Sequence, residues 1–141
     1  TLEFDGQNDK VTTTSNLDNL SGFTIELWVN AHKISVGRAI IGEDNLIECA
    51  FSGNNKIRIW VDGRGNPHNI VASINRSLFL NSWNHIAFVG NASSSPHLKI
   101  YVNGELKKSG GSNPGNNFGS GSNNKVIKIA ILSPNRRVSN H

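Results

Sequence analysis

Residues 80–106 read LNSWNHIAFVGNASSSPHLKIYVNGEL, and this stretch decides the fold class. It predicts two β-strands, Trp83 to Val89 and Leu98 to Val102, joined by a loop of small residues over Asn91 to Pro96 and followed by a turn at Asn103-Gly104. In the second strand apolar residues alternate with polar ones, as expected when only one face of a sheet meets a core. Two antiparallel strands are not stable alone in water, so the hairpin must belong to a larger sheet.

The same alternation recurs elsewhere in the chain. Phe23 to Asn30 and Lys56 to Asp62 place apolar residues at every second position. Shorter β-prone runs are Thr1 to Phe4, Lys10 to Thr14, Ala39 to Gly42, Asn45 to Phe51, Asn69 to Ile74 and Lys125 to Leu132. No run has a helical period, and Ser109 to Asn124 predicts a long exposed loop because it is rich in Gly, Ser and Asn. About seven to ten short strands without helices predict an all-β fold, a two-sheet antiparallel β-sandwich or jelly roll.

The length of 141 residues predicts one domain, which we expect over residues 1–132, followed by a polar, basic tail over residues 133–141. A domain of this size buries roughly 68–70% of its unfolded surface, so a core forms without metals or disulfides. The single cysteine, Cys49, alternates with Ile47 and Phe51 and is expected to be a small buried residue rather than a reactive thiol. No apolar run approaches the roughly 20 residues of a membrane helix, and no signal peptide is readable, so we expect a mature or excised piece.

Charge is distributed unevenly along the chain. Residues 1–62 contain five Lys or Arg against nine acidic residues, whereas residues 63–141 contain nine against Glu105 alone. A basic half can attract polyanions, including nucleic acid. Strands of a sandwich interleave in space, however, so we expect a mixed, solvated surface and consider nucleic acid an unlikely partner.

Four segments together resemble the laminin-G-like, concanavalin A-like lectin domains: LEFDGQNDKV, GFTIELWVNA, LNSWNHIAFV and LKIYVNGEL, in that order. The resemblance covers most of residues 1–132. It implies two curved antiparallel sheets in an extracellular or surface-exposed lectin-like domain, frequently with a bound calcium ion. It also implies that Trp28 is structural, and Trp83 is expected to lie in the core with Leu98, Ile100 and Val102.

The C-terminus departs from this pattern. Members of the family usually close with a further strand beside the N-terminal one, whereas this sequence ends in SPNRRVSNH. Either the domain is cut short or divergent, which we favour, or a neighbouring chain supplies the missing strand at the N-terminal strand edge.

Calcium is the cofactor considered first, because Asp5, Asn8 and Asp9 gather hard oxygen ligands around Gly6. Calcium takes six to eight oxygens at about 2.3–2.6 Å. The same side chains can instead form a solvated turn in which they accept backbone N–H groups. The family's distant carboxylate from the closing strand is missing here, which lowers the expected affinity.

The candidate sugar-binding residues are those that alternation places on the non-core side of the strands. They are Glu26, Arg58, Trp60, Asp62, Lys99 and Tyr101, with Trp60 the best single candidate because it stands between two charged residues. An aromatic ring offers an apolar platform for the C–H face of a sugar, while charged and amide groups bond its hydroxyls. Alternatively, a loop such as Ser109 to Asn124 folds over the Trp60 ring and buries it.

Catalysis is not expected. Glycoside hydrolases need two carboxylates about 5–5.5 Å or 6.5–9.5 Å apart. The sequence lacks the Glu-x-Asp-x-Glu pattern that glucanases of this fold carry, and a meeting of Glu26 and Glu48 across strands is the remaining alternative. The five histidines have no metal-ligand spacing. Three Asn-x-Ser matches, at Asn19, Asn75 and Asn91, are what chance gives in an Asn-rich chain.

These observations favour a non-catalytic carbohydrate-binding or adhesion module of a surface or secreted assembly, calcium-assisted, at a cell or virion surface. The alternative is a structural subunit of an extracellular filament, appendage or virion, in which the jelly roll contacts neighbouring copies or other subunits. A glycan or polysaccharide is the expected partner in the first case.

Overall fold

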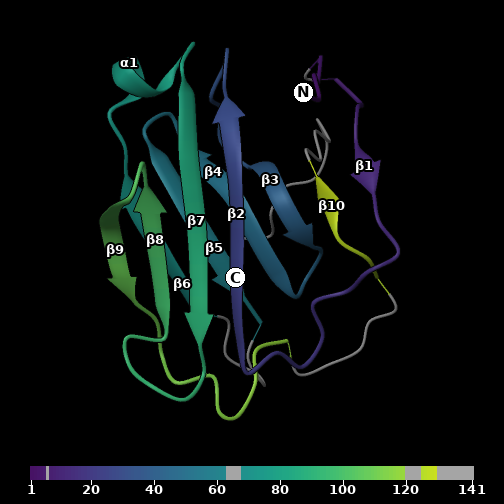
Figure 1. The fold of residues 1–141 in the computed structure, drawn as a ribbon, viewed down its shortest axis with the longest axis vertical. Helices are drawn as coiled ribbons and strands as arrows, with labels where there is room; N and C mark the ends of the chain where they lie inside the picture. Colours follow the sequence, from purple (N-terminus) through teal and green to yellow (C-terminus); the bar gives the residue numbers. More distant parts are fainter. Residues whose placement is uncertain (6, 63–67, 120–124, 130–141) are drawn as a thin grey trace.

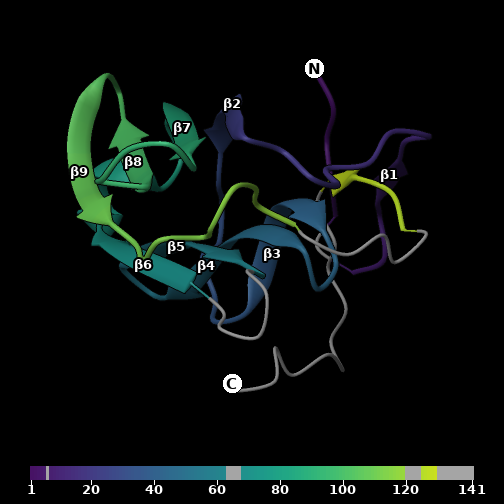
Figure 2. The ribbon, with the colours of Figure 1, turned by 90° about the horizontal axis from the view of Figure 1, so that it is seen from below.

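The computed structural model describes residues 1–141 except 6, 63–67, 120–124 and 130–141. The strands are Val11–Thr12 (β1), Gly22–Asn30 (β2), Arg38–Glu43 (β3), Ile47–Gly53 (β4), Lys56–Val61 (β5), His68–Ser73 (β6), Trp83–Asn91 (β7), Leu98–Val102 (β8), Glu105–Gly110 (β9) and Lys128–Ile129 (β10), and Arg76–Phe79 forms a helical turn (α1). Within this part of the chain a six-stranded sheet, in the order β1-β10-β3-β4-β5-β6, faces a four-stranded sheet in the order β2-β7-β8-β9 (Figures 1 and 2). All pairings between these strands are antiparallel, so the predicted two-sheet sandwich is confirmed.

The core lies between the two sheets, and strand alternation explains its composition. In β5, Ile57, Ile59 and Val61 are fully buried, while Arg58 and Trp60 between them are partly exposed. In β7 the even positions Ile86 and Phe88 are fully buried. A strand that meets a core on one side shows this period of two, and the predicted inward sets of β5 and β8 are confirmed.

Cys49 lies on the inner face of β4 and is fully buried, as predicted. Burial raises the pKa of its thiol well above the usual value, because desolvation disfavours the thiolate. The thiol therefore acts as a small apolar side chain of the core.

The hairpin that decides the fold is built as predicted. Asn103 and Gly104 both have positive φ values, 51° and 79°, which a two-residue turn between β8 and β9 requires. The Asn103 amide also ties this turn to the start of β7: its Nδ2 donates to Asn84 Oδ1 at 3.0 Å, and its Oδ1 accepts the His85 N–H at 2.9 Å. Asn84 is buried and donates to Phe79 O at 2.9 Å. This network fixes the position from which β7 begins.

Four expectations about local structure are wrong. Thr1 to Phe4 is not in a strand, and Arg76–Phe79 forms a helical turn where none was expected. The last described strand covers only Lys128–Ile129 of the expected Lys125 to Leu132, whose final three residues lie outside the described part. The expected loop from Ser109 begins inside β9, and its Phe118 is fully buried, with its ring 5.2 Å from that of Phe23. The residues around Phe118 in the sequence are polar, but Phe118 is buried because its ring packs against that of Phe23, which is distant in the sequence.

The N-terminal strand is not left unpaired on both sides. Val11 pairs with Ile129 and Thr12 with Lys128, so β10 of the same chain supplies a partner to β1. β1 is the end strand of the six-stranded sheet, so its other edge has no described partner strand. The same holds for β2, which pairs with β7 along one edge and with no described strand on the other. The described residues contain no helix that is both long and apolar enough to cross a membrane.

Candidate functional site

The outer face of the four-stranded sheet carries the largest exposed aromatic side chains of the described residues. Trp28 is 64% exposed and Trp83 53%. Because Trp28 pairs with His85 and Asn30 with Trp83, the two indoles project from diagonal positions of β2 and β7 on the same face. We call this surface the tryptophan face; its side chains are Glu26, Trp28, Trp83, His85, Ala87, Tyr101 and Leu106.

Cross-strand pairing gives the tryptophan face its layout. One row across the sheet runs Glu26, Ala87, Tyr101 and Leu106, and the next runs Trp28 and His85. The Trp28 and His85 rings lie 5.3 Å apart at 54°, and His85 Nε2 lies 3.5 Å from Glu26 Oε2. Ala87 is the small residue in the middle, so the surrounding rings stand above it. The face thus combines aromatic surface with a carboxylate and an imidazole.

Two expectations about tryptophans change here. The prediction that Trp83 lies in the core is wrong, since Trp83 is mostly exposed. The alternation of β7 contains the signal that identifies this: Ile86 and Phe88 point inward, so residues 83, 85 and 87 point outward. The indole of Trp28, expected to be structural, is 64% exposed, so it makes few packing contacts.

The sequence-predicted sugar residues are divided between two opposite faces. Glu26, Lys99 and Tyr101 lie on the outer side of the four-stranded sheet, with Lys99 between Val89 and Ser109. Arg58 and Trp60 lie on the outer side of the six-stranded sheet. Because the two groups lie on opposite sides of the sandwich, one ligand cannot contact both at once. The alternation of a strand shows which residues point outward, but it does not show to which of the two sheets the strand belongs.

On the six-stranded face, Trp60 is partly buried between Glu48 of β4 and Asn69 of β6. Burial raises the pKa of Glu48; an accepted hydrogen bond from the Asn45 N–H (2.9 Å) lowers it and nearby Asp44 raises it. Arg58 Nε is buried without a described partner. Asp62 follows β5, where its N–H donates to Leu46 O at 2.8 Å and its C=O accepts from Gly119. Sugar binding by Arg58, Trp60 and Asp62 stays a prediction.

Glu26 and Glu48 do not meet. Each lies on the outer face of a different sheet, with the core between them. This pair therefore cannot flank one glycosidic bond, which requires separations below about 10 Å on either side of a sugar.

The acidic turn near the N-terminus has the hydrogen bonds of a solvated turn. The Asp5 N–H donates to Asp9 Oδ2 at 2.9 Å, and the Gln7 N–H donates to Asp5 Oδ1 at 2.7 Å. One oxygen of each carboxylate is left without a hydrogen bond from these backbone groups, and the side-chain oxygen of Asn8 lies in the same turn; backbone carbonyls and waters would have to supply the rest of the six to eight oxygens that calcium takes. Among the described residues no group of three or more His, Cys, Asp or Glu side chains is arranged to hold a metal. Calcium binding by Asp5, Asn8 and Asp9 stays a prediction.

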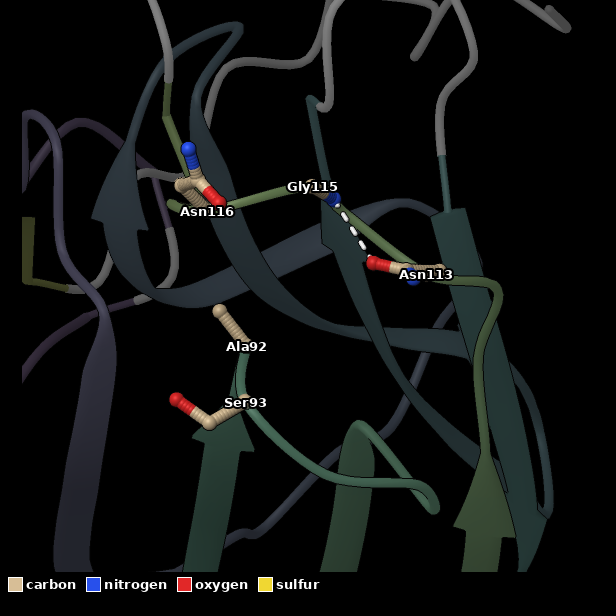
Figure 3. A pocket seen from close by; sticks show the side chains of 5 residues that line it. All are labelled: Ala92, Ser93, Asn113, Gly115 and Asn116. Carbon is tan, nitrogen blue, oxygen red and sulfur yellow. Dashed lines mark hydrogen bonds between the residues drawn. The ribbon is translucent and has the colours of Figure 1, made fainter.

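An open cavity of about 320 Å³ lies beyond the end of β7. Figure 3 shows Ala92 and Ser93 on one side and Asn113, Gly115 and Asn116 on the other. Asn113 Oδ1 accepts the Gly115 N–H at 2.9 Å, which shapes the second wall. β7 runs from Trp83 to Asn91, so this polar cavity and the two exposed indoles lie at opposite ends of the sheet.

Glu43 is a buried carboxylate that sequence reasoning missed. Its Oε2 accepts the Leu17 N–H at 2.7 Å, while its Oε1 is buried without a described partner. Burial raises the pKa of Glu43, the Leu17 hydrogen bond lowers it, Asp18 raises it and Lys125 lowers it. Glu43 pairs with Ile47 at the end of β3, and its contact with Leu17 joins residues 26 positions apart, which a local pattern does not reveal.

Replacing Glu43 by glutamine is expected to stabilise the protein at neutral pH. A carboxyl whose folded pKa is raised contributes stability that is present below its unfolded pKa and lost as pH rises through the folded pKa. E43Q has no carboxylate to ionise, so at pH 7 its free energy of unfolding should exceed that of the unmodified protein by about 1 kcal/mol, which corresponds to a rise in Tm of about 3 °C. Near pH 3, where Glu43 is protonated, the two proteins should differ little. Thermal melts at both pH values test this. The control Glu3→Gln, at an exposed position, should leave Tm unchanged at both pH values. A lower Tm for E43Q than for the unmodified protein at pH 7 would contradict the explanation that the buried charge of Glu43 is destabilising.

Comparisons with known proteins agree with this architecture. Residues 5–129 match the laminin G family model described as the concanavalin A-like lectin/glucanases superfamily. Two solved structures, titled as crystal structures of HCR/D mutants in which a tryptophan or a phenylalanine is replaced by alanine, match with TM-scores of 0.60 and 0.57 at 20% and 18% identity. They cover 88% and 89% of this chain, which spans 32% and 33% of theirs. A search of curated proteins gives no match.

This superfamily is mostly non-catalytic, although some members are glycosidases, and laminin G-like domains are typically extracellular. The fold supports a carbohydrate-binding or protein-interaction module in general. With the family match covering most of the described residues and the two-sheet sandwich in place, the chain belongs to the concanavalin A-like lectin/glucanases superfamily.

Proposed function

We propose that this chain is a non-catalytic carbohydrate-binding module of a surface or secreted assembly, and that it holds its glycan on the tryptophan face. The observation that carries the proposal is the pair of exposed indoles, Trp28 and Trp83, on one face of the four-stranded sheet. Large exposed apolar groups that gather on one surface mark interaction sites, because single-domain proteins otherwise bury them.

The chemistry of the face suits a sugar. An indole covers the C–H side of a pyranose ring, while groups at its rim bond the hydroxyls. Here Glu26 and His85 stand beside Trp28, and Tyr101 stands across Ala87 from Glu26. A carboxylate accepts hydrogen bonds from hydroxyls, and an imidazole or phenol both donates and accepts them. The rigid sheet presents these groups with little ordering cost, because β7 is hydrogen-bonded on both edges.

Trp28→Ala and Trp83→Ala should each weaken retention on a glycan array at least tenfold, the loss expected when a ring that covers a sugar is removed. The matched control is Trp60→Ala on the opposite face, which should retain binding. Thermal melts of all three variants establish that they are folded, and measurements with calcium or with a chelator test the calcium prediction separately.

The pattern of losses decides between faces. Loss in Trp60→Ala alone would transfer the site to Arg58, Trp60 and Asp62 on the six-stranded sheet. Unchanged retention by all three folded variants would contradict glycan binding at either tryptophan surface, and binding to proteins but to no glycan would favour the protein-interaction function.

A further inference from the structure

The charge of the tryptophan face differs from that of the whole chain. The chain has 14 Lys and Arg residues against 10 acidic ones, which gives a net charge of +4. The two strands that carry the exposed indoles contain none of these basic residues. Glu26 is the only charged residue of β2, and β7 has no Lys, Arg, Asp or Glu. A basic protein therefore presents its most exposed described indoles on strands whose formal charge is negative.

The lysines of the neighbouring strands β8 and β9 leave that negative charge in place. Lys99 lies two rows along the strands from Trp28, which is about 13 Å at the rise of a β-strand. Lys107 is bound to another carboxylate, with its Nζ 2.6 Å from Glu105 Oε2. Lys108 pairs with an inward-facing residue of β8, so it does not belong to the outer face. The part of the face around Trp28 thus differs in charge from the far side of the same sheet.

The carboxylate of Glu26 is accessible to a ligand. Its side chain is 64% exposed, and its Oε2 lies 3.5 Å from His85 Nε2. An imidazole is positively charged only when protonated, and imidazoles ordinarily titrate near pH 6.5. In the part of the chain that the structure describes, no Lys or Arg forms an ion pair with Glu26. A permanent positive charge beside this carboxylate would therefore have to come from a ligand.

The indole of Trp28 lies next to this carboxylate. Trp28 follows Glu26 by two positions on the same side of β2, and both side chains contact His85, the Trp28 ring at a centroid distance of 5.3 Å. The face of an indole attracts a cation, and a nearby carboxylate attracts the same cation by its charge. A neutral hydroxyl gains neither attraction, and a sulfate or carboxylate is repelled by Glu26. Trp28 and Glu26 together favour a positively charged group.

We propose that the tryptophan face selects glycans that carry positively charged nitrogen, as amino sugars do when their amino groups are not acetylated. This selectivity depends on the proposed glycan-binding function and adds the class of glycan. The sugar rings lie on the exposed indoles, and an ammonium group of the same glycan lies over Trp28 within reach of Glu26. Acidic polysaccharides, which the net charge of the whole chain would attract, are disfavoured on this face.

Two matched hexamers of β-1,4-linked glucosamine test the preference for charge. In one the nitrogens are trimethylated and permanently positive; in the other they are acetylated and neutral, with the same number of non-hydrogen atoms. Titration calorimetry at pH 8, above the ordinary range of imidazoles, gives both affinities. The charged hexamer should bind about tenfold more tightly, and high salt should reduce this ratio. Equal or tighter binding of the acetylated hexamer, or tighter binding of a β-1,4-linked glucuronic acid hexamer, would overturn the proposal.

A pair of carboxylate variants locates the preference. Glu26→Gln keeps the shape of the side chain without its charge, so the ratio of the two affinities should fall from about tenfold to below threefold. The matched control is Glu105→Gln on β9, at the opposite edge of the sheet, where the carboxylate is already bound to Lys107. This control should keep the tenfold ratio. Thermal melts establish that both variants are folded, and an unchanged ratio in folded Glu26→Gln would show that Glu26 does not select the charge.

The same measurements separate this selectivity from glycan binding itself. Equal binding of both hexamers that is lost in Trp28→Ala would overturn the selectivity and leave the glycan-binding function in place. Retention of other glycans on the array without binding of the charged hexamer would have the same meaning. Absence of binding to both hexamers and to every glycan of the array would overturn the selectivity and the proposed function together.

Discussion

Replacing Phe88 by alanine should lower the free energy of unfolding by about 3–5 kcal/mol, the usual cost of removing a buried phenylalanine. Phe88 is fully buried at the centre of β7, between Ile25 of β2 and Ile100 of β8. Its loss leaves a cavity beneath the strand that carries Trp83, His85 and Ala87. Because domains are stable by only about 5–15 kcal/mol, the variant should be partly unfolded at physiological temperature.

Urea denaturation measures this effect, and the adjacent Val89→Ala is its control. Val89 faces outward, is only partly buried, and should cost less than about 1 kcal/mol. A one-residue slip in the register of β7 would exchange these two effects, since it moves every side chain to the other face. Equal losses for the two variants would therefore contradict the pairing of β2 with β7.

Gly42→Ala should be the second most damaging single change, at about 2–3 kcal/mol or more. A Cβ at Gly42 would lie 2.2 Å from the backbone oxygen of Ile47, and the residue has a φ of 154°. The contact is with backbone, so it cannot be relieved by moving a side chain; the hairpin between β3 and β4 must open instead.

Gly53→Ala, at the end of β4 where Gly53 pairs with Lys56 of β5, provides the matched glycine control. A Cβ there meets only the Lys56 side chain, at 3.8 Å or more, so the change should be neutral or stabilise the protein slightly. Thermal or urea melts of the two variants compare them directly. If Gly42→Ala were as stable as Gly53→Ala, the pairing of Gly42 with Glu48 would be wrong.

Much of the fold follows from local pattern. Strict alternation in residues 23–30, 57–61 and 98–102 identifies the inward residues of three strands, and the Asn103-Gly104 turn fixes the hairpin between β8 and β9. These features depend on neighbours close in sequence, which is why the sequence alone reveals them.

The candidate site depends on information that alternation lacks. Trp60 and Tyr101 both read as outward, but they belong to different sheets because β5 pairs within a meander that never meets β8. Sheet membership is decided by long-range pairing, and so is the burial of Phe118 against Phe23. Trp83 is a different case. The inward positions of Ile86 and Phe88 imply that Trp83 points outward, but the family resemblance was used instead and placed Trp83 in the core.

The strand order also determines how long each strand waits for its partner during synthesis of the chain. β3 to β6 and β7 to β9 are meanders in which each strand pairs with the next, whereas β2 pairs with a strand about 50 residues later and β1 with one more than 100 residues later. At about 5–20 residues per second, β2 waits roughly 3–10 s on the ribosome before β7 exists, and β1 waits longer. During that interval β2 lacks its partner strand, so its alternating apolar residues stay exposed in the N-terminal third of the nascent chain.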